Sequence, residues 1–306
     1  MKTTKYMILA AAAMALAACS NDDEVTGGPV AAQVTADVGG VQQTRAAGTN
    51  WDADNDIGIS TVGDTKTTYT NMRYVTAGGD GNFTHVNGEA SGIFFQDATE
   101  EVTFNAYYPF KGTERTEAGT ISDVTTNDQT GQKDFDFMFA QGAKASRSNS
   151  TVSFTNDAIF KHMMTRLVLK IKTDKDNGFV ASDVTRGTYS LNGLKHSGTF
   201  NTADGTAAAT GEAGTDDWQI TATPSDENNV RTYTLILYPQ TLASALTFKA
   251  EIDNQAYTNK EIKPELQAGY SYTYEITVKK TGLEVSGCTI KDWNSGNAIP
   301  GDATMQ

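Results

Sequence analysis

The sequence is poor in cysteine and histidine. Its 306 residues include two cysteines, Cys19 and Cys288, and three histidines. Two cysteines cannot form a disulfide framework, so the chain must be stabilised by a buried core. The sequence also has no Gly-x-Ser-x-Gly motif and no Gly-rich phosphate loop, which leaves hydrolase and nucleotide chemistry without support. We expect no enzymatic activity, no cofactor and no metal ion.

Clusters of basic residues are also absent. The chain carries 37 acidic and 24 basic residues, which gives a formal net charge of −13. Proteins that bind nucleic acids gather Lys and Arg on one face to neutralise phosphates. We therefore expect no nucleic-acid partner, and we interpret the acidity as a source of solubility.

The longest apolar run lies at the N-terminus. It extends from Met7 to Ala18, follows two lysines and precedes acidic residues. Because a bilayer-spanning helix needs about 20 apolar residues, this layout predicts a cleaved export signal over residues 1–18. The last signal residues and Cys19 resemble the lipobox of bacterial lipoproteins, in which the cysteine thiol is acylated. We predict a lipid on Cys19 that anchors the chain in the cell outer membrane, exposed at the surface; the alternative is a plain secreted protein.

Beyond the signal, the pattern is that of β-strands. Val30, Val34 and Val38 belong to a segment in which apolar and polar residues alternate, as they do in a half-buried strand. Short β-rich runs follow throughout the chain, separated by clusters of Gly, Asn, Asp and Thr: 56–62, 69–76, 102–108, 135–140, 151–155, 165–173, 188–191, 218–223, 232–238, 246–252, 270–279 and 283–290. This pattern predicts an all-β protein built from β-sandwiches.

The domain boundaries follow from composition. Two strands end in Tyr-Pro, at Pro109 and Pro239, and they suggest equivalent positions in two sandwiches. Between them, residues 141–150 are small and polar, as in a linker. We predict a lipidated propeptide with the first strand over residues 19–45, an N-terminal sandwich over 46–148 and a C-terminal sandwich over 149–306.

Few residues qualify as a site. His162 adjoins apolar residues at the start of a strand, which favours a hydrogen-bonded structural histidine. The sequence Asp52-x-Asp54-x-Asp56 begins like a calcium loop but lacks the Gly and Glu of that loop, so we interpret it as a turn. Trp218 and Trp293 either stack on sugars or fill the core. Paired carboxylates of a surface glycosidase, brought together by the fold, stay open as a further hypothesis.

Several segments together resemble one family, in their order along the chain: the lipobox, Thr44-Arg45-Ala46, 51–59, 105–109, 136–140, 160–162, 237–239, 269–272 and 290–293. They are similar to the fimbrillin-like proteins of Bacteroidales, which build fimbriae (pili). The resemblance implies two tandem transthyretin-like antiparallel β-sandwiches and export as a lipoprotein. It also implies maturation by a trypsin-like protease that cuts after an arginine, here between Arg45 and Ala46.

Such a cut has physical consequences. The strand with Val30, Val34 and Val38 is then released or exchanged, and its loss exposes apolar side chains and unpaired backbone groups. A strand from a neighbouring pilin subunit can fill that place, and head-to-tail repetition builds a filament in the fimbrium. The donor is either Leu283–Ile290 or the tail that follows Trp293, although Gly296, Pro300 and Gly301 make the tail a poor strand.

The role within a fimbrium stays open at this point. A tip, accessory or stalk subunit for surface adhesion is predicted to lose its lipid through the cut. A pilus anchor, or a surface lipoprotein that binds glycans or other ligands, keeps both the lipid and its first strand. The sequence does not identify a host or bacterial ligand.

Overall fold

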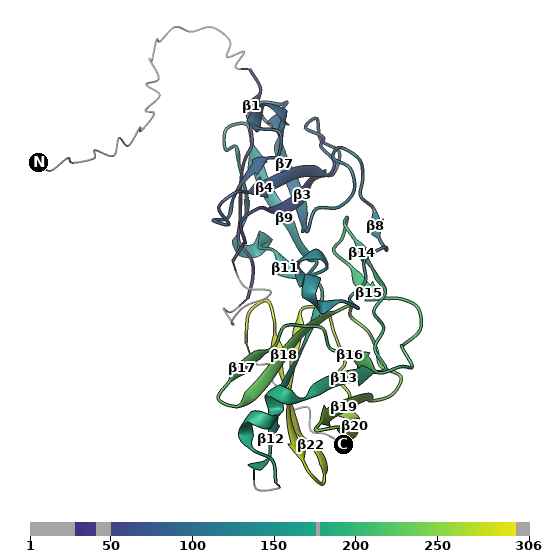
Figure 1. Cartoon of the computed structure of the whole chain (residues 1–306). Coiled ribbons are helices and arrows are strands. Elements are labelled where there is room, and N and C mark those ends of the chain that lie inside the picture. Colours follow the sequence, from purple (N-terminus) through teal and green to yellow (C-terminus); the bar gives the residue numbers. More distant parts are fainter. Residues whose placement is uncertain (1–27, 41–49, 176–177, 298–306) are drawn as a thin grey trace, which may run out of the picture.

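The computed structural model describes residues 28–40, 50–175 and 178–297, and it consists mainly of β-strands joined by turns and short 3₁₀ helices (Figure 1). The predicted all-β sandwich class is confirmed. In the elongated molecule, the strands from the N-terminal half lie at one end and those from the C-terminal half at the other (Figure 1). No helix in the described part of the chain is long and apolar enough to cross a bilayer.

One eight-stranded sheet forms the N-terminal end, in the order β10-β2-β5-β4-β3-β7-β9-β11. Its strands are β2 (Gln33–Ala36), β3 (Asn55–Val62), β4 (Met72–Thr76), β5 (Asn82–His85), β7 (Glu101–Tyr108), β9 (Met138–Ser146), β10 (Thr151–Phe154) and β11 (Lys161–His162). Buried and half-exposed residues alternate along them, as in β4, where Met72 and Tyr74 are buried. This period of two gives each strand one core-facing side, and the resulting core contains Ile57 and Phe104.

Two further sheets form the C-terminal end. The five-stranded sheet has the order β17-β18-β12-β21-β22, and the four-stranded sheet has the order β16-β13-β19-β20. Their strands are β12 (Thr165–Thr173), β13 (Thr188–Asn192), β16 (Trp218–Gln219), β17 (Ser225–Glu227), β18 (Val230–Leu237), β19 (Leu246–Ile252), β20 (Gln255–Ile262), β21 (Tyr270–Lys279) and β22 (Gly282–Asp292). Both sheets contribute to one core, for example Leu169 and Ile276 from the first and Phe248 from the second, which is the arrangement of a sandwich.

The two ends share a third core at their junction. A three-stranded sheet combines β8 (Thr120–Ile121) with β14 (Gly198–Asn201) and β15 (Ala207–Ala209), so both halves of the sequence contribute to it. Phe137 and Phe200 stack there at 4.5 Å between ring centroids. The side chain of Gln129, on η2 (Gln129–Asp134), donates to the carbonyl of Ile236 and accepts from its N–H, each at 2.9 Å. The ends are therefore joined by packing as well as by the chain.

The predicted boundary between residues 148 and 149 is wrong. Strands β10 and β11, assigned by the prediction to the C-terminal sandwich, pair with β2 and β9 of the N-terminal sheet, and the first strand of the C-terminal sheets begins at Thr165. The small polar residues at 141–150 suggested a linker, but strand β9 continues into this segment and ends at Ser146. There Ala143 and Ala145 are buried while Lys144 is exposed, which is ordinary strand alternation with small residues in the core.

Candidate functional site

The candidate site is built around the predicted first strand, residues 30–38, which we name the leader strand. Its first part, β1 (Val30–Ala31), pairs antiparallel with β6 (Phe94–Phe95). Its second part, β2, runs between β10, to which it is parallel, and β5, to which it is antiparallel. Val38 then forms an isolated bridge with Phe160. The central part of the leader strand, β2, therefore has neighbours on both sides and is an interior strand of the sheet.

The side chains of the leader strand alternate between core and surface. Val34, Ala36 and Val38 are 3%, 1% and 6% exposed and belong to the N-terminal core. Thr35 points to the other side, where its hydroxyl Oγ1 donates to Ser153 Oγ at 3.2 Å, and Val30 is only partly buried. The predicted alternation is confirmed, with Val34 and Val38 as its main apolar contacts.

Main-chain hydrogen bonds hold the strand along its length. The N–H of Ala36 donates to the carbonyl of Gly81 at 2.9 Å, and the N–H of Asp37 donates to Phe154 at 3.0 Å. The indole Nε1 of Trp51 donates to the carbonyl of Ala36 at 2.8 Å. Removal of the strand would leave each of these buried partners unpaired, at a cost of about 1–3 kcal/mol for each group that water cannot reach.

The predicted lipidation and processing residues lie outside the described residues. Cys19 precedes the first described segment. Arg45 and Ala46 belong to residues 41–49, which lie between the first two described segments. Residues 41–49 are thus the covalent connection between the leader strand and the rest of the chain. A single cut between Arg45 and Ala46 would leave the leader strand held by non-covalent contacts alone.

The end of the leader strand meets the C-terminal part of the chain. The N–H of Gly39 donates to the carbonyl of Phe160 at 2.8 Å. A Cβ atom at Gly39 would lie 3.1 Å from the carbonyl oxygen of Asn294. Asn294 in turn accepts a hydrogen bond from the N–H of His162 at 2.6 Å through its side-chain oxygen. Three segments far apart in sequence therefore meet at Gly39.

His162 is a buried structural histidine, as predicted. Its Nδ1 lies 2.9 Å from the carboxylate of Asp136, and its ring stacks on Trp293 at 3.8 Å between centroids. The guanidinium of Arg166 lies 4.9 Å from the centroid of the Trp293 ring. Burial lowers the pKa of Arg166, whereas the nearby Asp136 opposes that shift. Trp293 is 3% exposed, so it fills the junction and is not a surface platform for sugars.

The other candidates from the sequence lie apart. His85 pairs with Glu114 at 2.5 Å, and His196 Nδ1 lies 3.2 Å from Thr126 Oγ1, so the three histidines occupy separate sites. The segment with Asp52, Asp54 and Asp56 is a turn, with Asp54 at a φ of 65°, and Asp56 forms an ion pair with Arg73 at 2.6 Å. In the described segments, no group of His, Cys, Asp and Glu side chains is arranged to hold a metal.

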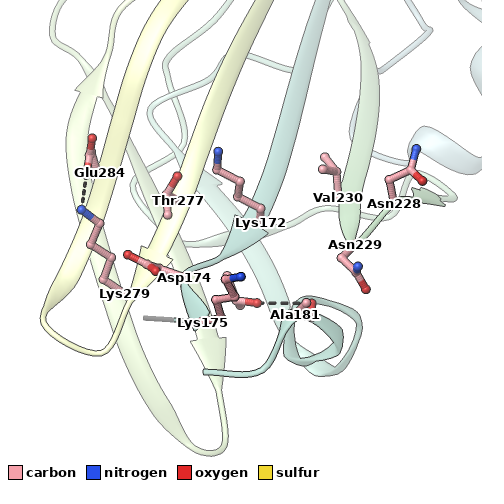
Figure 2. Close-up of a pocket in the computed structure, with 11 residues that line it drawn as sticks. Lys172, Asp174, Lys175, Ala181, Asn228, Asn229, Val230, Thr277, Lys279 and Glu284 are labelled. Atoms are coloured by element: carbon pink, nitrogen blue, oxygen red, sulfur yellow. Dashed lines mark hydrogen bonds and ion pairs between the residues drawn. The ribbon is translucent and has the colours of Figure 1, made fainter. Parts of the chain in front are cut away.

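Two cavities lie in the C-terminal end. The larger, of about 480 Å³, opens between β12, β18, β21 and β22, and Figure 2 shows Lys172, Lys175 and Lys279 around it. Lys279 is paired with Glu284, and Asp174 is a second acid at the rim (Figure 2). The smaller cavity, of about 230 Å³, is bordered by Trp218 and His196. Both cavities lie outside the N-terminal sheet, so they are separate from the leader strand.

Comparison with known proteins points to one family. A family model described as fimbrillin-like matches residues 44–293. The chain is 29% identical over 310 residues to a candidate fimbrium subunit, Fim1C, of Bacteroides uniformis, and the alignment covers 97% of each protein. The crystal structure of a candidate cell adhesion protein from Bacteroides ovatus superposes with a TM-score of 0.73 at 27% identity, over 87% of this chain and 98% of that chain.

A second crystal structure has a similar fold. It is that of a candidate cell adhesion protein from Bacteroides uniformis, with a TM-score of 0.67 and 25% identity over 87% of this chain and 99% of that chain. The family match begins at Thr44, so the leader strand lies before the matched region although it is part of the folded sheet.

Proposed function

The chain belongs to the fimbrillin-like family, and on this premise we propose that it is a fimbrial subunit that accepts a strand from a neighbouring subunit in place of its own leader strand. The precursor is exported as a lipoprotein with its lipid on Cys19. A trypsin-like protease then cuts between Arg45 and Ala46, and the mature protein leaves its lipid anchor in the outer membrane and joins the fimbrium, where it serves surface adhesion without catalysis.

One observation carries this proposal. The leader strand is interior to the sheet, yet residues 41–49 are its covalent link to the rest of the fold. Cleavage there converts an intramolecular strand into a dissociable peptide. Its departure would leave the facing edges of β5 and β10 unpaired, and such edges pair readily with an extended segment of another chain.

The energetics favour replacement over an empty site. Burial of Val34 and of Val38 contributes roughly 1.5–3 kcal/mol each, and both are almost inaccessible to solvent. Their departure also exposes Phe83 and Val152, which are paired with Val34 in the sheet. A state without any strand would lose these contributions, so the vacated position would favour binding of an alternating apolar segment.

The structure supports acceptance of a strand more strongly than donation. The predicted donor region Leu283–Ile290 lies in β22, which pairs with β21 from Gly282 to Asp292 and buries Val285. Donation of this strand would break that ladder. The other predicted donor, the tail, lies largely outside the described residues. These pairings favour a tip or accessory subunit over a stalk subunit.

A second function is supported by the completeness of the uncut fold. With the leader strand in place, the described part of the chain contains no buried side-chain polar atom without a hydrogen-bond partner. The uncut protein is thus a finished structure that can serve as a pilus anchor or a ligand-binding surface lipoprotein. This alternative predicts a retained lipid and no exchange.

Intact mass measurement tests the proposal. Protein recovered from the cell surface is treated with trypsin, and the masses of the products are compared with those from an Arg45→Ala variant. We expect a folded product that begins at Ala46, a separate leader peptide, and assembly into filaments seen by electron microscopy after cleavage. The variant should keep its leader strand and stay unassembled.

Two results would decide against the proposal. If the natural protein keeps its acylated Cys19 and resists cleavage at Arg45, the anchor or ligand-binding alternative holds. If cleavage occurs but the leader peptide stays bound while subunits assemble, then the leader site is not where subunits join.

A further inference from the structure

The smaller cavity, at the C-terminal end, has the composition of a ligand site. Its lining includes residues of β13 and β16, which lie next to each other (Figure 1). In this pair of strands, Leu191 is opposite Trp218. Leu191 and Leu194 are 1% and 2% exposed and line the cavity, while Trp218 is only partly buried. Small-molecule sites combine an apolar lining with a few polar groups that set orientation.

Two contacts hold the Trp218 side chain in place, and both are with residues that also line the cavity. Its Nε1 donates to the carbonyl of Asn127 at 2.8 Å, and its ring lies 4.4 Å from the imidazole of His196 between centroids. Burial lowers the pKa of His196, so its imidazole is neutral at pH 7 and has one donor and one acceptor nitrogen. Because the indole donor is already used, the part of Trp218 that lines the cavity offers an apolar aromatic surface.

Two carboxylates, those of Asp216 and Asp217, lie at the rim of the cavity. Asp216 and Asp217 are exposed and directly precede Trp218. Asp217 forms an ion pair with Lys249 at 3.1 Å, whereas Asp216 is in no ion pair within the described segments. An ionised carboxylate accepts hydrogen bonds and donates none, so the rim suits a ligand that is rich in hydroxyl donors and carries no negative charge.

We propose that this cavity, bordered by Trp218 and Asp216, binds one neutral sugar ring of a glycan. The C–H face of a pyranose packs on the indole, and its hydroxyl groups donate to the carboxylate of Asp216. The volume of about 230 Å³ is below the range of about 300–1,000 Å³ typical of drug-sized ligands, which suits a single ring. The site is independent of the leader strand and gives the protein a binding surface of its own.

Saturation-transfer NMR on the full-length, uncut chain tests this site. The probes are D-glucose, D-galactose, D-mannose and N-acetyl-D-glucosamine, with D-glucuronate as the anionic comparison. We expect signal transfer to at least one neutral sugar with a Kd of about 1 mM, and at least tenfold weaker transfer to glucuronate. Asp216→Ala should weaken binding about tenfold, since it removes one charged acceptor worth about 1.4 kcal/mol.

Matched variants separate the site from nonspecific effects. Asp157→Ala changes an exposed aspartate of the N-terminal half, and Lys172→Ala with Lys175→Ala changes the larger cavity (Figure 2); both should bind as the natural chain does. Trp218→Ala should abolish binding. If Trp218→Ala also lowers the melting temperature, Asp216→Ala still tests the site, because it changes an exposed side chain.

The inference is overturned by any of three results. They are the absence of transfer to every neutral sugar, equal binding of glucuronate, and binding that Asp216→Ala leaves unchanged. None of these results bears on cleavage at Arg45 or on strand exchange, so the fimbrial proposal is judged separately.

Discussion

Replacement of alternate residues in the leader strand tests its position in the sheet. Val34→Ala truncates a side chain that is 3% exposed and paired with Phe83 and Val152. Thr35→Ala truncates the adjacent side chain, which is half-buried on the opposite side and forms one hydrogen bond, to Ser153. The two variants lie one position apart, so they differ mainly in the side of the sheet that they affect.

The expected magnitudes follow from what each change removes. Val34→Ala deletes two methyl groups, each worth about 0.8 kcal/mol, and the residual cavity raises the loss to about 2 kcal/mol. Thr35→Ala loses one partly solvated hydrogen bond, worth about 0.5 kcal/mol. We expect the free energy of unfolding to fall about 1.5 kcal/mol further in the first variant than in the second.

Two assays measure this difference. Urea unfolding, followed by tryptophan fluorescence, reports the stability of the uncut chain, in which Trp51 donates to Ala36 and so senses the strand. After cleavage at Arg45, a loss of 2 kcal/mol in the contacts of the leader peptide corresponds to about 30-fold weaker retention. Equal losses in the two variants, or a larger loss for Thr35→Ala, would refute the placement of Val34 in the core.

Three further predictions concern the C-terminal end and the junction. Gly198→Ala places a Cβ atom 2.3 Å from the ring of Tyr238, so overpacking should lower the free energy of unfolding by about 1–3 kcal/mol and lower Tm in calorimetry. Gln129→Ala leaves the backbone N–H and carbonyl of Ile236 without their side-chain partner; urea unfolding should show a loss of about 2–3 kcal/mol. Burial lowers the pKa of His196 from its usual 6.5, so the unfolded state binds more protons, and stability should fall as the pH drops below about 6.5. That fall should be smaller in His196→Asn, measured by urea unfolding between pH 5 and pH 8.

Strongly alternating strands were predictable from the sequence. The runs 165–173, 246–252 and 270–279 coincide with β12, β19 and β21, because their core-facing residues are large and apolar. Strand β20 was missed, since most of its residues are exposed and polar. It is held by pairing with β19, which is a contact that the local pattern of β20 does not reveal.

The neighbours of the leader strand could not be predicted either. Alternation identified residues 30–38 as a strand, but its parallel partner β10 lies more than a hundred residues later. The same limit applies to His162. Its role as a structural histidine followed from its apolar neighbours, whereas Asp136 and Trp293, its partners, are brought to it only by the fold.

The contacts of the leader strand define what another subunit must supply. Val34, Ala36 and Val38 require apolar side chains at alternate positions, and the position of Gly39 requires a small residue. A Cβ atom at Gly39 would lie 3.1 Å from the carbonyl oxygen of Asn294 and 3.2 Å from that of Phe160. Both oxygens belong to backbone, which cannot move aside as a flexible side chain can.

Competition between peptides can test this requirement. Cleaved protein is incubated with a labelled peptide of residues 28–40, and unlabelled variants compete for the vacated site. Gly39→Val adds a branched side chain beside Asn294 and Phe160, and overpacking of about 1–3 kcal/mol corresponds to roughly 5- to 150-fold weaker competition. Thr35→Val alters a position on the other side of the strand, where a side chain of similar size is tolerated, so it should compete nearly as well as the natural peptide. Equal competition by both variants would mean that the end of the leader strand does not limit which strand can enter the site.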